Sequence, residues 1–120
     1  MLGFIAGMGL WGFAKASLLG AHRTSMHALG APELLEELQF RVGVERVLAP
    51  RLSIAPHLAR LGQAALFGLM HPGLEVDAAL GGYVYSKAYE GHGLVGAVLS
   101  HVAHNAGVWL GSVERRTVKG

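Results

Sequence analysis

The chain has 120 residues, no cysteine and a formal net charge of +2. Without cysteine it can form neither disulfides nor thiolate metal sites, and it has no cysteine nucleophile. Its basic residues are dispersed and do not cluster with aromatics, so no nucleic-acid partner is expected. The length predicts one domain over residues 1–120. Its 18 glycines and 52% hydrophobic residues favour closely packed apolar helices of the kind found in membranes.

The first segment, residues 1–20, is almost entirely apolar, and Lys15 is its only charged residue. As a helix it would be about 30 Å long, which matches the apolar core of a bilayer. A membrane span with Lys15 directed toward one interface is the favoured interpretation. A signal peptide is weaker, because the start carries no positive charge, although small residues flank Lys15 at cleavage spacing. A buried helix of a soluble protein is the third interpretation.

After a polar turn region at residues 21–31, Pro32 occupies the favoured first turn of a helix that is expected to reach about Leu48. Within that helix, Glu37 and Arg41 are one turn apart on the same face and can pair. Glu36 lies about 100° around the helix from Glu37, so it has no such partner. Taken alone, this pattern is most simply an ion pair on a solvated helix face. The polar clusters further along the chain favour a functional role instead.

Two more polar pairs lie on apolar helices in the second half of the chain. Phe67 and His71 are one turn apart, and so are His101 and Asn105. Such polar groups in apolar helices are expected to face the interior of a bundle and to carry function. Together with the segments above, the pattern predicts an all-α, membrane-embedded bundle of about five helices. The three remaining helices are expected over residues 57–70, 74–88 and 94–110, with a polar turn at residues 89–93.

These residue types suit the attack of water on a carbonyl group. A partly desolvated carboxylate such as Glu36 can take a proton from water, and a histidine can share that task. A second histidine and an asparagine amide can donate hydrogen bonds to the developing oxyanion. The alternative is a zinc site made by Glu36, His71 and His101, with His104 as a further ligand. The spacing is not that of an HExxH motif, so the metal signal is weak.

The combination of motifs resembles the CAAX-protease and bacteriocin-processing (CPBP) family of intramembrane endopeptidases, which includes the type II CAAX prenyl endopeptidases. The resemblance extends over about residues 33–110. Any single motif is unspecific, but three in the same order on apolar helices are a fairly strong signal. The matching motifs are Glu36-Glu37-x-x-x-Arg41, Phe67-x-x-x-His71 and His101-x-x-x-Asn105.

The resemblance implies an all-helical membrane protease of the glutamate type. By this likeness, Glu36 and His71 would activate the water, and His101 and Asn105 would stabilise the oxyanion. No cofactor is expected, although the family has also been described as metal-dependent, which leaves zinc open. Three residues would support the site: Glu37, Arg41 and Phe67.

The resemblance also implies a protein or peptide substrate, such as a prenylated CAAX protein or a peptide precursor. The lipid bilayer is an expected partner, and the expected location is integral to a bacterial cell membrane. Because family members usually have more helices, assembly into a homo-oligomer is one way to complete the cavity. Two other functions are consistent with the sequence. One is a non-catalytic membrane interaction or bacteriocin-immunity protein of the same fold, and the other is a soluble helical metal-binding protein.

Overall fold

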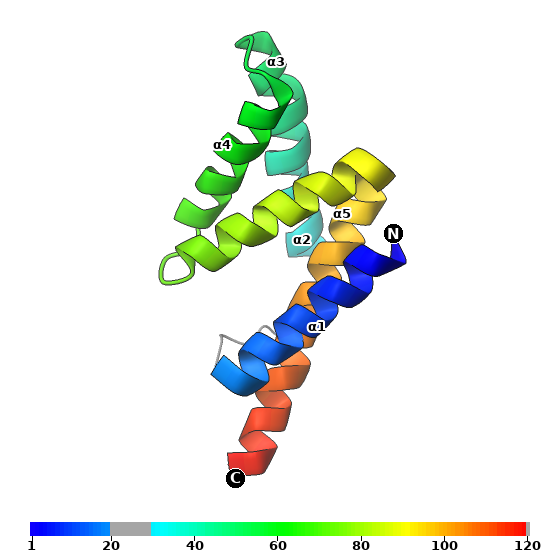
Figure 1. Ribbon diagram of the computed structural model, residues 1–120, viewed down its shortest axis with the longest axis vertical. Helices are drawn as coiled ribbons and strands as arrows, with labels where there is room; N and C mark the ends of the chain where they lie inside the picture. The colour runs from blue at the N-terminus through cyan, green and yellow to red at the C-terminus, as the bar shows by residue number, and fades with distance from the viewer. Residues whose placement is uncertain (20–29, 120) are drawn as a thin grey trace.

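The computed structural model describes residues 1–19 and 30–119 (Figure 1). These residues form four continuous helical stretches and no strand, so the expected all-α fold is confirmed. The last stretch is interrupted by non-helical backbone at Gly93, which divides it into two arms. The elements are α1 (Leu2–Leu19), α2 (Ala31–Glu37), the π-helix η2 (Leu38–Leu48), α3 (Ala49–Arg51), α4 (Pro56–Leu69) and α5 (Glu75–Lys119).

The start of α2 follows from its first residues. Gly30 adopts a positive φ of 107°, and Pro32 occupies the first turn. The carboxylate of Glu33 accepts a hydrogen bond from the backbone N–H of Gly30 at 3.1 Å, as in a capping box. From Leu38 onward the turns widen to the i→i+5 pattern of a π-helix, which the sequence did not predict. Most of the turn region predicted for residues 21–31 lies outside the described residues.

The corner between α4 and α5 agrees with the sequence, but the predicted break within α5 is too long. Gly73 has a positive φ of 85° in the short turn after α4. The helix then continues through residues 89–92, where a polar turn was predicted. Only Gly93 leaves the helical region, with φ 70° and ψ −166°. Glycine has no Cβ atom and adopts a positive φ at little cost, so this single glycine can turn the chain.

Helix α1 lies along the second arm of α5, the arm that leads to the C-terminus (Figure 1). The two backbones are in close contact at glycines. A Cβ atom added to Gly107 would lie 2.1 Å from the carbonyl oxygen of Gly9, and one added to Gly12 would lie 2.2 Å from that of His104. Small residues at the crossing therefore allow α1 to approach α5 closely enough for Lys15 to reach α5 side chains.

Replacement of Gly107 by alanine is expected to lower the free energy of unfolding by about 1–3 kcal/mol, because the new methyl group clashes with the backbone of α1. Gly7→Ala is the matched control. A Cβ at Gly7 meets nothing within 4 Å, and this change in a helix should stabilise the protein by about 0.5–1 kcal/mol. Denaturant titration in detergent, followed by circular dichroism, measures both. Equal stability of the two variants would contradict the close helix crossing.

The burial pattern is unusual, because charged groups lie inside and large apolar groups lie outside. Arg41 and Glu37 are fully buried, whereas Leu2 and Leu18 are 80% and 76% exposed. Most of the buried apolar residues are alanines, and the larger ones include Phe67. In the two described ranges, however, no helix combines the length and the apolar character needed to cross a bilayer. The membrane-spanning part of the expected fold is therefore not shown by these helices.

Candidate active site

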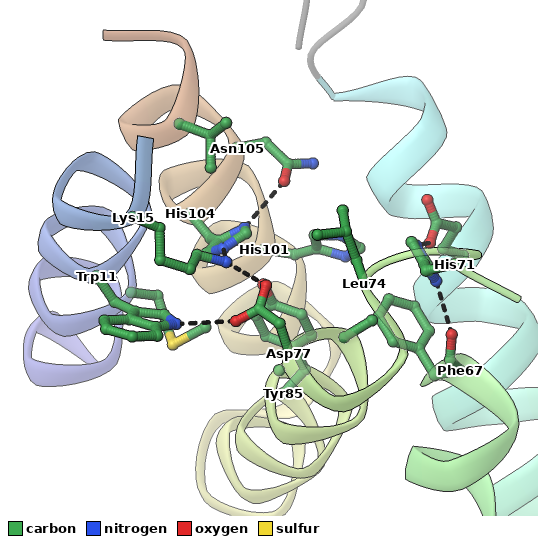
Figure 2. A pocket seen from close by; sticks show the side chains of 15 residues that line it. Trp11, Lys15, Phe67, His71, Leu74, Asp77, Tyr85, His101, His104 and Asn105 are labelled. Carbon is green, nitrogen blue, oxygen red and sulfur yellow. Dashed lines mark hydrogen bonds and ion pairs between the residues drawn. The ribbon is translucent and has the colours of Figure 1, made fainter. Parts of the chain in front are cut away.

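A cavity of about 200 Å³ lies where α1, α2, the α4–α5 corner and the second arm of α5 meet (Figure 2). Its wall includes the four residues that the sequence singled out for catalysis, which are Glu36, His71, His101 and Asn105. They come from three segments that are far apart in the chain. The spatial convergence expected from the sequence is therefore present in the structure. The other lining residues are Met8, Trp11, Lys15, Phe67, Leu74, Asp77, Ala78, Gly81, Tyr85, His104 and Val108.

The predicted pair of Glu37 and Arg41 forms a buried brace behind this wall. The Nε of Arg41 donates to Glu37 Oε1 at 2.7 Å, and a terminal nitrogen donates to Oε2 at 3.2 Å. The other terminal nitrogen donates to the amide oxygen of Gln63. The amide nitrogen of Gln63 donates in turn to the carbonyl oxygen of Gly82 at 3.1 Å. The brace thus joins α2, η2, α4 and α5. The sequence offered only one clue to Gln63, namely a lone amide on an apolar helix.

His101 is held by the same brace. Its Nδ1 lies 2.8 Å from Oε2 of Glu37, and its ring stacks on Tyr85 with centroids 4.5 Å apart. In the described residues no buried side-chain nitrogen or oxygen lacks a partner. Among the described residues, none forms a hydrogen bond with Nε2 of His101, and the residue is part of the cavity wall. The contact with Glu37 therefore orients the His101 ring so that Nε2 points away from the Glu37 carboxylate.

Glu36 and His71 face each other at the cavity. Nε2 of His71 lies 3.6 Å from Oε2 of Glu36, and both side chains are about one-third exposed. Nδ1 of His71 donates to the carbonyl oxygen of Phe67 at 2.6 Å. The Phe67 ring also packs on the His71 ring with centroids 4.5 Å apart, so the predicted packing of Phe67 is present. These contacts fix the imidazole with Nε2 toward the carboxylate.

Each member of this pair shifts the pKa of the other. Burial alone would raise the pKa of Glu36, and it is the largest single influence. The contact with His71 and the positive charges around the carboxylate outweigh it, so the pKa of Glu36 lies below its usual value. The contact with Glu36 is the main cause that raises the pKa of His71, against the opposing effect of burial. Both shifts favour a carboxylate beside an imidazolium.

We expect Glu36→Gln to lower the pKa of His71, because it removes the main cause that raises it. Titration of the histidine ring signals by NMR measures this, with Glu114→Gln on an exposed part of α5 as the control. Both pKa shifts also make the free energy of unfolding depend on pH, in opposite directions. The contribution of Glu36 is lost as the pH falls through its lowered folded pKa. That of His71 is lost as the pH rises through its raised folded pKa. An unchanged His71 titration would refute the pairing.

Asn105 lies on the second arm of α5, one turn after His101 (Figure 2). Its amide nitrogen donates to Glu33 Oε1 at 3.3 Å, and its amide oxygen lies 3.0 Å from Nδ1 of His104. Nε2 of His104 lies 2.6 Å from Nζ of Lys15, which also pairs with Asp77. Sequence reasoning did not assign Glu33, Lys15 or Asp77 to the site, because these contacts join segments up to 89 residues apart.

A model of the family "type II CAAX prenyl endopeptidase Rce1-like" matches residues 24–107. The chain belongs to this family. No curated protein and no solved structure matches it. The matched range contains all three motifs, at residues 36–41, 67–71 and 101–105, so the family predicted from them is confirmed. Helix α1, which adds Trp11 and Lys15 to the cavity of this Rce1-like chain, lies outside the matched range.

The residues named as an alternative metal site do not fit one as they are placed. In residues 1–19 and 30–119, no group of three or more histidine, aspartate or glutamate side chains is arranged to hold a metal ion. Because Nδ1 of His101 faces Glu37 and Nδ1 of His71 faces the backbone, only the Nε2 atom of each ring could reach an ion. The absence of a cofactor, with zinc as the open alternative, stays a prediction from the sequence, which elemental analysis would test.

Proposed function

We propose that this Rce1-like chain is an endopeptidase in which Glu36 and His71 activate a water molecule for attack on a peptide bond. The observation that carries the proposal is the placement of the Glu36 carboxylate 3.6 Å from Nε2 of His71 on the wall of the cavity. At this distance the two atoms are close enough for one water molecule beside them to contact both. The family match supports peptide hydrolysis as the reaction class.

In the proposed reaction, the water oxygen attacks the carbonyl carbon while its proton passes to Glu36. The lowered pKa of Glu36 keeps the carboxylate ionised and ready to accept that proton at neutral pH. His71, held by the carbonyl group of Phe67, hydrogen-bonds the water and balances the charge of Glu36. When the tetrahedral intermediate collapses, the C–N bond breaks and the proton goes to the leaving nitrogen. Water is consumed, and one carboxyl and one amino group are formed.

Asn105 and His101 are the proposed partners of the oxyanion. The amide nitrogen of Asn105 has two protons, and its contact with Glu33 uses one of them. His101 differs, because its Nδ1 is directed at Glu37. In the neutral ring with a proton on Nδ1, Nε2 only accepts hydrogen bonds. His101 can therefore donate to the oxyanion only as an imidazolium, and Glu37 is placed to balance that charge.

The proposed substrate is a membrane-associated protein or peptide with a prenylated CAAX sequence. The family description supports this class. The exposed surface supports it too, because large exposed apolar areas mark sites that bind lipid or protein. Exposed or partly exposed apolar side chains line the cavity at Trp11 on α1 and at Leu74 just before α5, and the exposed Leu10 and Val76 are near them in the chain. Location in a bacterial membrane and assembly into a homo-oligomer stay predictions from the sequence.

A cleavage assay tests the proposal. The full chain in detergent is incubated with a farnesylated peptide ending in a CAAX sequence, with the same peptide unprenylated, and with a peptide library. Mass spectrometry identifies the products. We expect the parent and Glu114→Gln to cleave, and Glu36→Gln to cleave at least about 10²-fold more slowly. If a folded parent cleaves none of the peptides, the chain is non-catalytic. If Glu36→Gln cleaves as fast as the parent, the assigned base is wrong.

A further inference from the structure

A chain of hydrogen bonds leads from α1 to the proposed oxyanion site. Lys15 is 6% exposed, although it carries a charge on an apolar helix. Its ammonium group pairs with Asp77, which also accepts a hydrogen bond from Nε1 of Trp11 at 3.2 Å (Figure 2). The same ammonium group lies 2.6 Å from Nε2 of His104. Nδ1 of His104 lies 3.0 Å from the amide oxygen of Asn105.

The chemistry of these groups determines where each proton lies. An ammonium group has only donors, so Lys15 must donate to Nε2 of His104, which then has to be unprotonated. A neutral imidazole has one N–H, which is left on Nδ1. That N–H donates to the amide oxygen of Asn105. The amide oxygen is thereby turned toward His104, and the NH₂ group is turned toward Glu33. The reverse orientation would place an NH₂ group against an N–H.

We propose that Lys15 is a positioning residue that acts through His104 to orient the amide of Asn105, so that Asn105 presents its NH₂ group to the oxyanion. The expected effect on catalysis rests on the proposed function. The orientation of the Asn105 amide by Lys15 and His104 rests only on the contacts described above. Lys15 lies outside the range matched by the family model, so α1 supplies a part of the site that the matched region does not contain.

The electrostatics of His104 agree with this role. Burial, followed by the positive charge of Lys15, lowers the pKa of His104 to about 4. The ring is therefore neutral at pH 7, as the arrangement requires. Asp77 acts in the opposite direction, because its negative charge favours a protonated ring. Without the ammonium group, Nε2 would lose the donor that requires it to be unprotonated, while the negative charge of Asp77 favours a proton on the ring.

The tautomer of His104 is measured directly by long-range ¹H–¹⁵N NMR on the full chain in detergent. We expect unprotonated Nε2 and protonated Nδ1 in the parent and in Lys15→Arg, which keeps a cationic donor. Lys15→Met should give a protonated Nε2. Lys87→Met, at an exposed site on the first arm of α5, is the matched control and should leave the signal unchanged. If Nε2 of His104 is protonated in the parent, the proposal is wrong. This measurement needs no variant, so it decides the matter even if Lys15→Met does not fold.

Kinetics test the consequence for catalysis. Loss of an oxyanion donor typically lowers kcat by about 10²–10³. We expect Lys15→Met to lower kcat at least about tenfold with little change in KM, and Lys15→Arg to restore much of it. A changed tautomer with unchanged kcat overturns the positioning role, and so does an unchanged tautomer in Lys15→Met. If the parent cleaves no peptide, the proposed function fails, and the NMR result still decides whether Lys15 sets the tautomer.

Discussion

Replacing Arg41 by methionine is expected to lower the free energy of unfolding by about 3–5 kcal/mol, because it leaves Glu37 charged and buried without its main partner. Both side chains are fully buried. The guanidinium also lies 5.2 Å from the centroid of the Phe67 ring and 5.7 Å from that of the Tyr85 ring. Its removal therefore affects packing as well as charge. Denaturant unfolding in detergent gives the free energy, with Arg51→Met at an exposed position as the control.

A double variant separates charge from packing. If the uncompensated carboxylate causes most of the loss, Arg41→Met combined with Glu37→Gln should be more stable than Arg41→Met alone. Arg41→Lys should recover little, because an ammonium group cannot reproduce the fork that contacts Glu37 and Gln63. Stability of Arg41→Met within about 0.5 kcal/mol of the parent would show that the brace does not hold these helices together.

Local spacing explains why part of the site was predictable. Glu37 and Arg41 pair because they are four residues apart on one helix, and Phe67 packs on His71 for the same reason. These contacts need no knowledge of how the helices pack. Such spacing also identified Glu36 as the acid without a partner on its own helix. The structure places Glu36 beside His71, which lies at the end of another helix.

The remaining contacts depend on tertiary packing, which the spacing of residues does not determine. Lys15 was interpreted as a charge directed to a membrane interface, yet it is buried against Asp77 and His104. Its position follows from the glycine contacts between α1 and α5, which bring distant segments together. Asn105 likewise meets Glu33, which lies 72 residues away in the chain. The π-helical turns of η2 have no sequence signature either.

The largest effect on activity is expected from Glu36 and His71, each of which should be needed for the water to react. General acid–base groups contribute about 10²–10⁴-fold to rates, so Glu36→Gln and His71→Asn should each lower kcat/KM by about that factor. His57→Asn, at an exposed site at the start of α4, is the control for the second substitution. Unfolding curves close to that of the parent would confirm that the losses come from chemistry.

The double variant tests whether the two groups act as one unit. If Glu36 accepts a proton from a water that His71 holds, removing either group stops the same step. Glu36→Gln combined with His71→Asn should then be about as slow as the slower single variant, because effects within one catalytic unit are not additive. Independent roles would instead multiply the two losses. A multiplied loss would mean that the two side chains act in separate steps and that they do not activate one water together where they approach to 3.6 Å.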